Sequence, residues 1–98
     1  MSKPQILLLI PMEIVEDERL NSAQKILYSI IRSGRQAHDD GIYCLFENSH
    51  FSRIMNTSES SILRHLRALE SCGLIEREVI RDKKTNEVIE RRIYILEV

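Results

Sequence analysis

The stretch that decides the fold is residues 47–72, ENSHFSRIMNTSESSILRHLRALESC. Apolar residues recur in it at helical spacing in two groups, which are Phe51, Ile54 and Met55 and then Ile62, Leu66 and Leu69. The polar break between the groups is Asn56-Thr57-Ser58. Asparagine tolerates the left-handed conformation that ends a helix, and the Ser58 hydroxyl can accept a backbone N–H at the start of the next helix. The stretch therefore predicts two helices that cross at a steep angle.

A third amphipathic helix is predicted upstream, over residues 21–34. Its apolar stripe consists of Ala23, Ile26, Leu27, Ile30 and Ile31. Asn21 and Gln24 have the spacing of a capping box at the start of this helix, and Gly34 is expected to end it. Three helices of this kind can share one apolar core.

The remaining N-terminal half has weaker patterns. Residues 1–11 predict an extended arm or strand, since an apolar run lies between two prolines. Residues 12–20 suit a short helical turn or an irregular connection. Residues 35–41 are polar and predict a loop, and residues 42–46 predict a short strand.

The C-terminal part, residues 74–96, predicts a β-hairpin. Two segments rich in β-branched residues flank a tip of turn-forming residues, Asp82 to Asn86. Gly73 separates the hairpin from the preceding helix, and Asn86 stands where a positive φ would be tolerated. The whole chain, residues 1–98, is short enough to form a single domain.

The predicted order is helix, strand, helix, turn, helix and two-stranded wing. This is an α+β fold of the winged helix-turn-helix type, with a three-helix core, a β-hairpin wing and a short additional strand. The residues themselves resemble the recognition region of that superfamily, in FSRIMNTS (51–58), SSILRHL (60–66) and LESCGLIER (69–77). Upstream, Ile10-Pro11, Leu20 to Ala23 and Leu27-Tyr28 resemble the lead-in of small helix-turn-helix domains in plasmid and phage replication-organiser or conjugation accessory proteins.

This resemblance extends over about residues 10–96 and implies a function. It implies sequence-specific binding of double-stranded DNA, as an accessory protein at a plasmid or phage origin of replication or transfer. The alternative within the same class is a transcriptional repressor or regulator of such an element. The implied partners are double-stranded DNA, a second copy of the chain and replication or transfer proteins.

The charge of the chain weakens the case for DNA binding. The formal net charge is −1, so no general attraction to DNA is expected. Charge is uneven, however, with acidic residues near the N-terminus and basic residues on the predicted wing. The competing class is a winged-helix module for protein–protein interaction or oligomerisation without DNA binding, in which residues 5–10 could pair with a partner as an edge strand.

The second helix of the motif provides the first group of candidate contacts. An α-helix fits the major groove, and residues near its N-terminus reach base edges and phosphates. The candidates there are Ser58, Ser60, Ser61, Arg64 and His65. Arg64 is the expected base reader, because arginine can donate two hydrogen bonds to guanine. A surface ion pair of Arg64 with Glu59 or Glu70 is the alternative, and Ser58 suits a cap better than a DNA contact.

A second group of candidates lies outside that helix. His50 and Arg53 suit contacts with the DNA backbone, and Arg81, Lys83 and Lys84 on the wing suit phosphates or a minor groove. The alternative for both sets is an ordinary solvated surface. The remaining arginines of the wing, Arg77, Arg91 and Arg92, alternate with glutamates and predict cross-strand pairs.

Other functions lack support in the sequence. The chain has no Gly-rich phosphate-binding motif, and its histidines and cysteines (His38, His50, His65, Cys44, Cys72) are not at the spacings of a zinc site. No pair of residues suggests acid–base catalysis, so no enzyme, cofactor or metal is predicted. Two distant cysteines, no signal-type leader and no apolar run near the roughly 20 residues of a membrane helix predict a cytoplasmic protein without a membrane partner.

Overall fold

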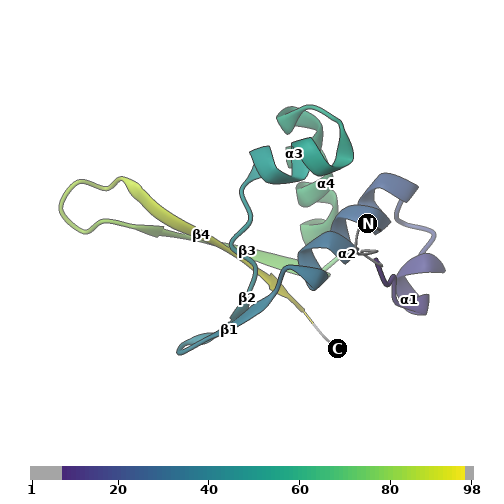
Figure 1. The fold of residues 1–98 in the computed structure, drawn as a ribbon, viewed down its shortest axis with the longest axis horizontal. Helices are drawn as coiled ribbons and strands as arrows, with labels where there is room; N and C mark the ends of the chain where they lie inside the picture. Colours follow the sequence, from purple (N-terminus) through teal and green to yellow (C-terminus); the bar gives the residue numbers. More distant parts are fainter. Residues whose placement is uncertain (1–7, 97–98) are drawn as a thin grey trace, which may run out of the picture.

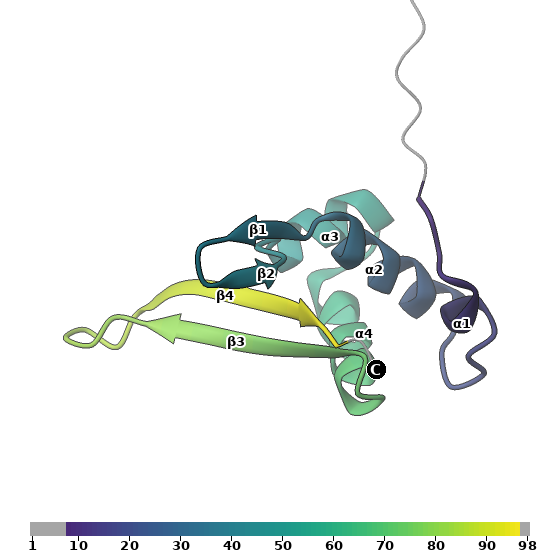
Figure 2. The ribbon, with the colours of Figure 1, turned by 90° about the horizontal axis from the view of Figure 1, so that it is seen from below.

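The fold consists of a helical core that carries two β-hairpins (Figure 1). The computed structural model describes residues 8–96. In chain order the elements are α1 (Met12–Val15), α2 (Ser22–Ser33), β1 (Gln36–His38), β2 (Gly41–Tyr43), α3 (Asn48–Met55), α4 (Glu59–Ser71), β3 (Ile75–Arg81) and β4 (Val88–Ile95). Strands β3 and β4 form the long wing, which extends well beyond the helices in both views (Figures 1 and 2). This is the α+β arrangement that the sequence predicts.

Helix α2 begins at the predicted capping box. The Asn21 side chain accepts a hydrogen bond from the Gln24 backbone N–H at 2.9 Å, and the Gln24 side chain accepts one from the Asn21 N–H at 3.0 Å. Gly34 ends the helix with a φ of −86°, a value open to any residue. Its small size is required instead by Phe46, because a Cβ on Gly34 would lie 2.3 Å from the Phe46 ring.

The turn between α3 and α4 has the predicted chemistry. Asn56 adopts the left-handed conformation, with a φ of 51°. The Thr57 N–H donates to the Ser52 carbonyl at 3.1 Å and completes the end of α3. Ser58 then caps α4 by accepting the Ser61 N–H at 3.1 Å. The left-handed Asn56, the backbone bond of Thr57 and the Ser58 cap therefore explain why two helices are separated here by only three residues.

One apolar core joins the helices to the base of the wing. Its fully buried members come from α2, α3, α4 and both wing strands, and they include Leu27, Ile31, Phe51, Ile62, Leu66, Leu69, Ile75 and Ile93. The distal wing has little core beneath it, since Val88 and Ile89 are 56% and 64% exposed. The helices are thus held by hydrophobic burial, whereas the outer wing is held mainly by strand pairing.

The segment after α2 differs from the prediction. Residues 36–38, expected to be part of a loop, form strand β1, which pairs antiparallel with β2. The predicted strand 42–46 is shorter, at Gly41–Tyr43, and continues as a bridge in which Cys44 and Ile93 exchange backbone hydrogen bonds of 2.9 and 3.0 Å. The loop prediction was based on the polar side chains of this segment. It was wrong because a strand on an exposed hairpin needs no apolar side chains. This hairpin lies alongside β4 (Figure 2).

At the N-terminus, the predicted arm or strand is only partly described. Residues 1–7 lie outside the described part of the chain, and Leu8 to Ile10 have no regular secondary structure. Residues 12–20, predicted as a short helical turn or an irregular connection, contain the one-turn helix α1, whose Ile14 is buried in the core.

Candidate nucleic-acid interface

The exposed face of α4 presents polar and basic side chains. Ser60, Arg64, Arg67 and Ser71 are all exposed, and their spacing of four, three and four residues places them in one row. We call this row the α4 stripe. The buried residues Ile62, Leu66 and Leu69 lie on the opposite side of the helix. Arg67 is not among the contacts predicted from the sequence, although its three-residue spacing from Arg64 indicates the shared face.

Arg64 is available for an external ligand. Its guanidinium donates one hydrogen bond to the Ser61 hydroxyl, with an Nη2–Oγ distance of 3.1 Å. Within residues 8–96 it makes no ion pair with Glu59 or Glu70, and Glu70 is instead paired with Arg77. Because arginine has five donors, the bond to Ser61 leaves donors free while restricting the side chain.

The three serines at the start of α4 form a small network. The Ser58 hydroxyl lies 3.2 Å from the Ser60 hydroxyl and donates to the Ser61 hydroxyl at 2.9 Å, besides accepting the Ser61 N–H. Ser58 therefore acts as a cap, as the sequence suggests. Ser60 is exposed and does not cap the helix, so it is the serine of this network best placed to contact a ligand.

His65 faces the helical core rather than the α4 stripe. It is half-buried, and its Nδ1 lies 3.5 Å from the side-chain amide of Gln24 on α2. Burial, aided by the positive charge of Arg64, lowers the pKa of His65. The ring is therefore neutral at pH 7 and is poorly suited to neutralise a phosphate.

The lowered pKa of His65 predicts a pH dependence of stability. Its ordinary value is 6.5, so below that pH the unfolded chain takes up a proton more readily than the folded protein. We expect the free energy of unfolding to fall as the pH drops from about 6.5 through the folded pKa, and His65→Gln to reduce this dependence. An NMR titration of the His65 ring with a midpoint at or above 6.5 would contradict the assignment.

The two candidates on α3 lie in different surroundings. His50 is half-buried against Phe46, with 4.3 Å between ring centroids, and lines an apolar groove of about 730 Å³ between α2 and α3. Arg53 lies in the last turn of α3, is exposed and has no hydrogen-bonding or ionic partner among residues 8–96. Of the two, only Arg53 is an exposed basic side chain.

The wing tip is a basic turn with several local hydrogen bonds. The Asp82 carboxylate accepts the backbone N–H groups of Lys84 at 2.8 Å and Thr85 at 3.0 Å, and these bonds lower the pKa of Asp82. Asn86 has the predicted positive φ, at 60°, and its carbonyl accepts a 3.0 Å hydrogen bond from Arg81. Lys83 and Lys84 are exposed. The structure thus places two lysines at the end of a projecting ribbon, apart from the α4 stripe (Figure 1).

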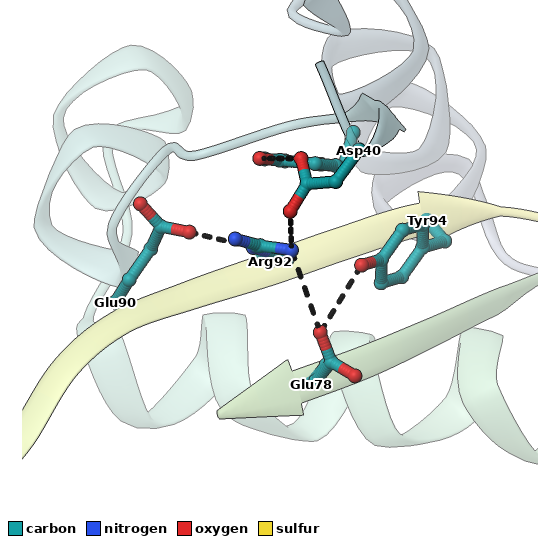
Figure 3. A network of polar contacts seen from close by, with 6 residues as sticks. Asp40, Glu78, Glu90, Arg92 and Tyr94 are labelled. Atoms are coloured by element: carbon teal, nitrogen blue, oxygen red, sulfur yellow. Dashed lines mark hydrogen bonds and ion pairs between the residues drawn. The ribbon is translucent and has the colours of Figure 1, made fainter. Parts of the chain in front are cut away.

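The prediction of cross-strand pairs holds only for Arg92. This residue contacts Glu78 across the hairpin at 3.9 Å, Glu90 at 2.6 Å and Asp40 at 2.7 Å, and Figure 3 shows it at the centre of this network. Arg77 instead reaches Glu70 on α4, and Arg91 reaches the Phe46 carbonyl and the Asn48 side chain. The prediction was wrong for these two because helices α4 and α3, and the connection before α3, supply acceptors close to the strands.

Tyrosines complete the contact between the short hairpin and the wing. The Arg92 guanidinium lies 4.4 Å from the centre of the Tyr43 ring, and the Tyr43 hydroxyl donates to Asp40 at 2.8 Å. Burial and this hydrogen bond raise the pKa of Tyr43 to about 12. On the other side, Tyr94 donates to Glu78 at 3.1 Å (Figure 3). The network attaches the β1–β2 turn to the wing, away from the α4 stripe.

Residues 8–96 contain no cluster of three or more histidine, cysteine or acidic side chains that could bind a metal ion. Over the same range, no helix has the length and apolar character needed to cross a membrane.

Comparison with known proteins agrees with this geometry. A family model described as a helix-turn-helix domain matches residues 18–75, more than half of the chain. A structure described as the N-terminal domain of a DNA binding protein is similar at a TM-score of 0.70 and 21% identity, over 95% of this chain and 76% of that one. A structure of a Rep-DNA complex is similar at a TM-score of 0.65 and 22% identity, with the same two coverages. No curated protein matches the chain.

Proposed function

The chain belongs to the helix-turn-helix domain family, and from that premise we propose that it binds double-stranded DNA. Helix α4 enters a major groove, and the wing tip contacts an adjacent phosphate backbone or minor groove. The observation that carries this proposal is the α4 stripe, in which Arg64 and Arg67 are exposed on the face opposite the core. We propose that Arg64 reads a base and that Arg67, Arg53, Lys83 and Lys84 contact the DNA backbone.

The biological setting that we propose is a plasmid or phage origin of replication or transfer, where the protein acts as an accessory factor. The resemblance of its lead-in sequence and its likeness to a structure of a Rep-DNA complex support this setting. A repressor of such an element would use the same interface. Such a protein acts by occupying a DNA site, which requires no catalytic step. The DNA of a plasmid or phage lies in the cytoplasm, so we propose that the protein acts there.

We further propose that the protein binds as a homodimer. Each copy, residues 1–98, is then a single domain. One α4 and one wing cover a limited DNA surface, and pairing two copies on adjacent half-sites doubles it. Replication or transfer proteins would then be recruited to the occupied site. Sedimentation of the protein–DNA complex tests the stoichiometry, and one copy per site would contradict the homodimer.

The proposed function is tested by electrophoretic mobility shift with fragments of the genetic element that encodes the protein. Random-sequence competitor and two salt concentrations separate specific from general binding. We expect one fragment to resist competition and to bind more weakly at higher salt. Failure to bind any fragment, at either salt concentration, would overturn the DNA proposal.

Removal of a wing lysine is expected to affect all DNA sequences alike. Lys84→Ala deletes one exposed cation at the tip, so the slope of log K against log salt should become shallower by about 0.9, the value for one phosphate contact. The control is Lys25→Ala, which removes the same charge from α2, where the ammonium group donates to the Val15 carbonyl. Equal slopes for wild type and Lys84→Ala would exclude a phosphate contact by this residue.

A further inference from the structure

The wing strand β3 is attached to α4 by a bidentate ion pair between Arg77 and Glu70. Arg77 donates from Nε to one Glu70 oxygen and from Nη2 to the other, both at 3.0 Å. Paired bonds of this geometry restrict orientation as well as distance. Arg77 lies near the base of β3, and Glu70 lies near the end of α4. The pair therefore links the wing to the helix that carries the α4 stripe.

The other strand, β4, is attached to α3 by a second arginine. Arg91 donates to the Phe46 carbonyl and to the side-chain oxygen of Asn48, which is the first residue of α3. Arg91 is half-buried, so these bonds are shielded from competing water. Each strand of the wing thus has an arginine bound to a different helix of the helix-turn-helix motif.

The wing needs such attachments because its outer half has no core of its own. Ile75 and Ile93 are buried at the base, whereas Val79, Val88 and Ile89 are between 47% and 64% exposed. An isolated two-stranded ribbon is only marginally stable and twists readily. Its direction relative to α4 must therefore be set by contacts with the helical core, which Arg77 makes near the base of the wing and Arg91 makes further along it, opposite Val79.

We propose that Arg77 and Arg91 are positioning residues for DNA binding. They hold the wing at a fixed angle to α4, so that the wing tip and the α4 stripe meet the same duplex together. Once the α4 stripe or the wing tip has bound DNA, the other is already in place and binds at a lower entropy cost. This is the usual effect of linking two binding elements rigidly. This inference rests on the proposed function, but the geometry can be tested without DNA.

The DNA test combines each positioning variant with Lys84→Ala. Arg77→Lys and Arg91→Lys keep the positive charge but lose the planar fork, and Asn48→Ala removes one acceptor while keeping Arg91. We expect all three variants to bind DNA with a shallower salt slope than wild type. We also expect the slope change caused by Lys84→Ala to shrink from about 0.9 toward zero in these backgrounds.

A matched control separates positioning from simple loss of stability. Arg19→Lys alters an arginine that pairs with Asp17 outside the wing, at 2.7 Å. Its salt slope should equal that of wild type, and its effect should add to that of Lys84→Ala. If Arg91→Lys and Asn48→Ala behave like this control, the positioning role is overturned, because lower stability alone leaves the slope unchanged.

The test without DNA measures residual dipolar couplings of backbone amides. In wild type, the couplings of residues 82–87 should fit the same alignment tensor as those of α4. In Arg91→Lys and Asn48→Ala they should shrink, while those within α4 persist. Unchanged couplings would overturn the inference even if wild type bound DNA. A fixed wing in a protein that binds no DNA would overturn the proposed function instead.

Discussion

Arg64→Ala is expected to weaken binding to the specific DNA site by about 5- to 150-fold, which corresponds to about 1–3 kcal/mol for one lost arginine–guanine pair. Binding to random DNA should fall far less, so the ratio of specific to random affinity should drop. The physical reason is that Arg64 is exposed on the α4 stripe and has no ionic partner in the described chain. Titrations with both DNA types at one salt concentration measure this ratio.

Two comparison variants make the Arg64 result specific. Arg19→Ala removes the same charge outside the α4 stripe and should preserve the affinity ratio. Arg67→Ala removes the next arginine of the stripe, and we expect an equal loss on specific and random DNA, because a backbone contact carries no base information. An equal loss on both DNA types for Arg64→Ala would show that Arg64 also contacts only the backbone.

Phe51→Ala is expected to have the largest effect on folding. Phe51 is fully buried in the core and contacts the Phe46 ring edge to face, at 5.9 Å between centroids. Truncation of such a residue costs about 3–5 kcal/mol, through lost burial and the cavity left behind. The whole free energy of unfolding of a small domain is only about 5–15 kcal/mol. Urea unfolding followed by circular dichroism should show the loss as a lower midpoint with a similar slope.

The matched control for Phe51→Ala lies one turn further along the same helix. Ile54 is 52% exposed, so Ile54→Ala removes little buried surface and should cost less than about 1 kcal/mol. Both substitutions leave the good helix former alanine in α3, which cancels the effect on helix propensity. Similar losses for the two variants would mean that Phe51 is not the centre of the core.

Several local features could be predicted because their physics lies within a few residues of chain. The capping box of Asn21 and Gln24, the left-handed Asn56 and the positive φ of Asn86 are all confirmed. Each depends on a side chain bonding, or a backbone bending, within its own turn. The apolar spacing of the helices likewise predicts which face is buried, and hence the architecture.

The candidate site could be predicted from the sequence less completely than these local features. Arg64 and the wing lysines are exposed as expected, but His65 and His50 lie against neighbouring elements, next to Gln24 and Phe46 respectively. Helical position alone assigns His65 to the zone near the N-terminus of α4. Only the packing of α2 beside α4 decides that its ring turns inward.

The sequence by itself determined the helix-turn-helix, the wing and the residues that begin and end them, because caps, turns and apolar periodicity act over short distances along the chain. The tertiary structure alone decided that Arg77 binds Glu70 of α4 and Arg91 binds Asn48 of α3 rather than neighbouring strands, and that Gly34 must be small to admit Phe46. It also decided that residues 36–38 form a strand. These features depend on segments distant in the chain or on an exposed pairing, and no local pattern encodes which partner lies within reach.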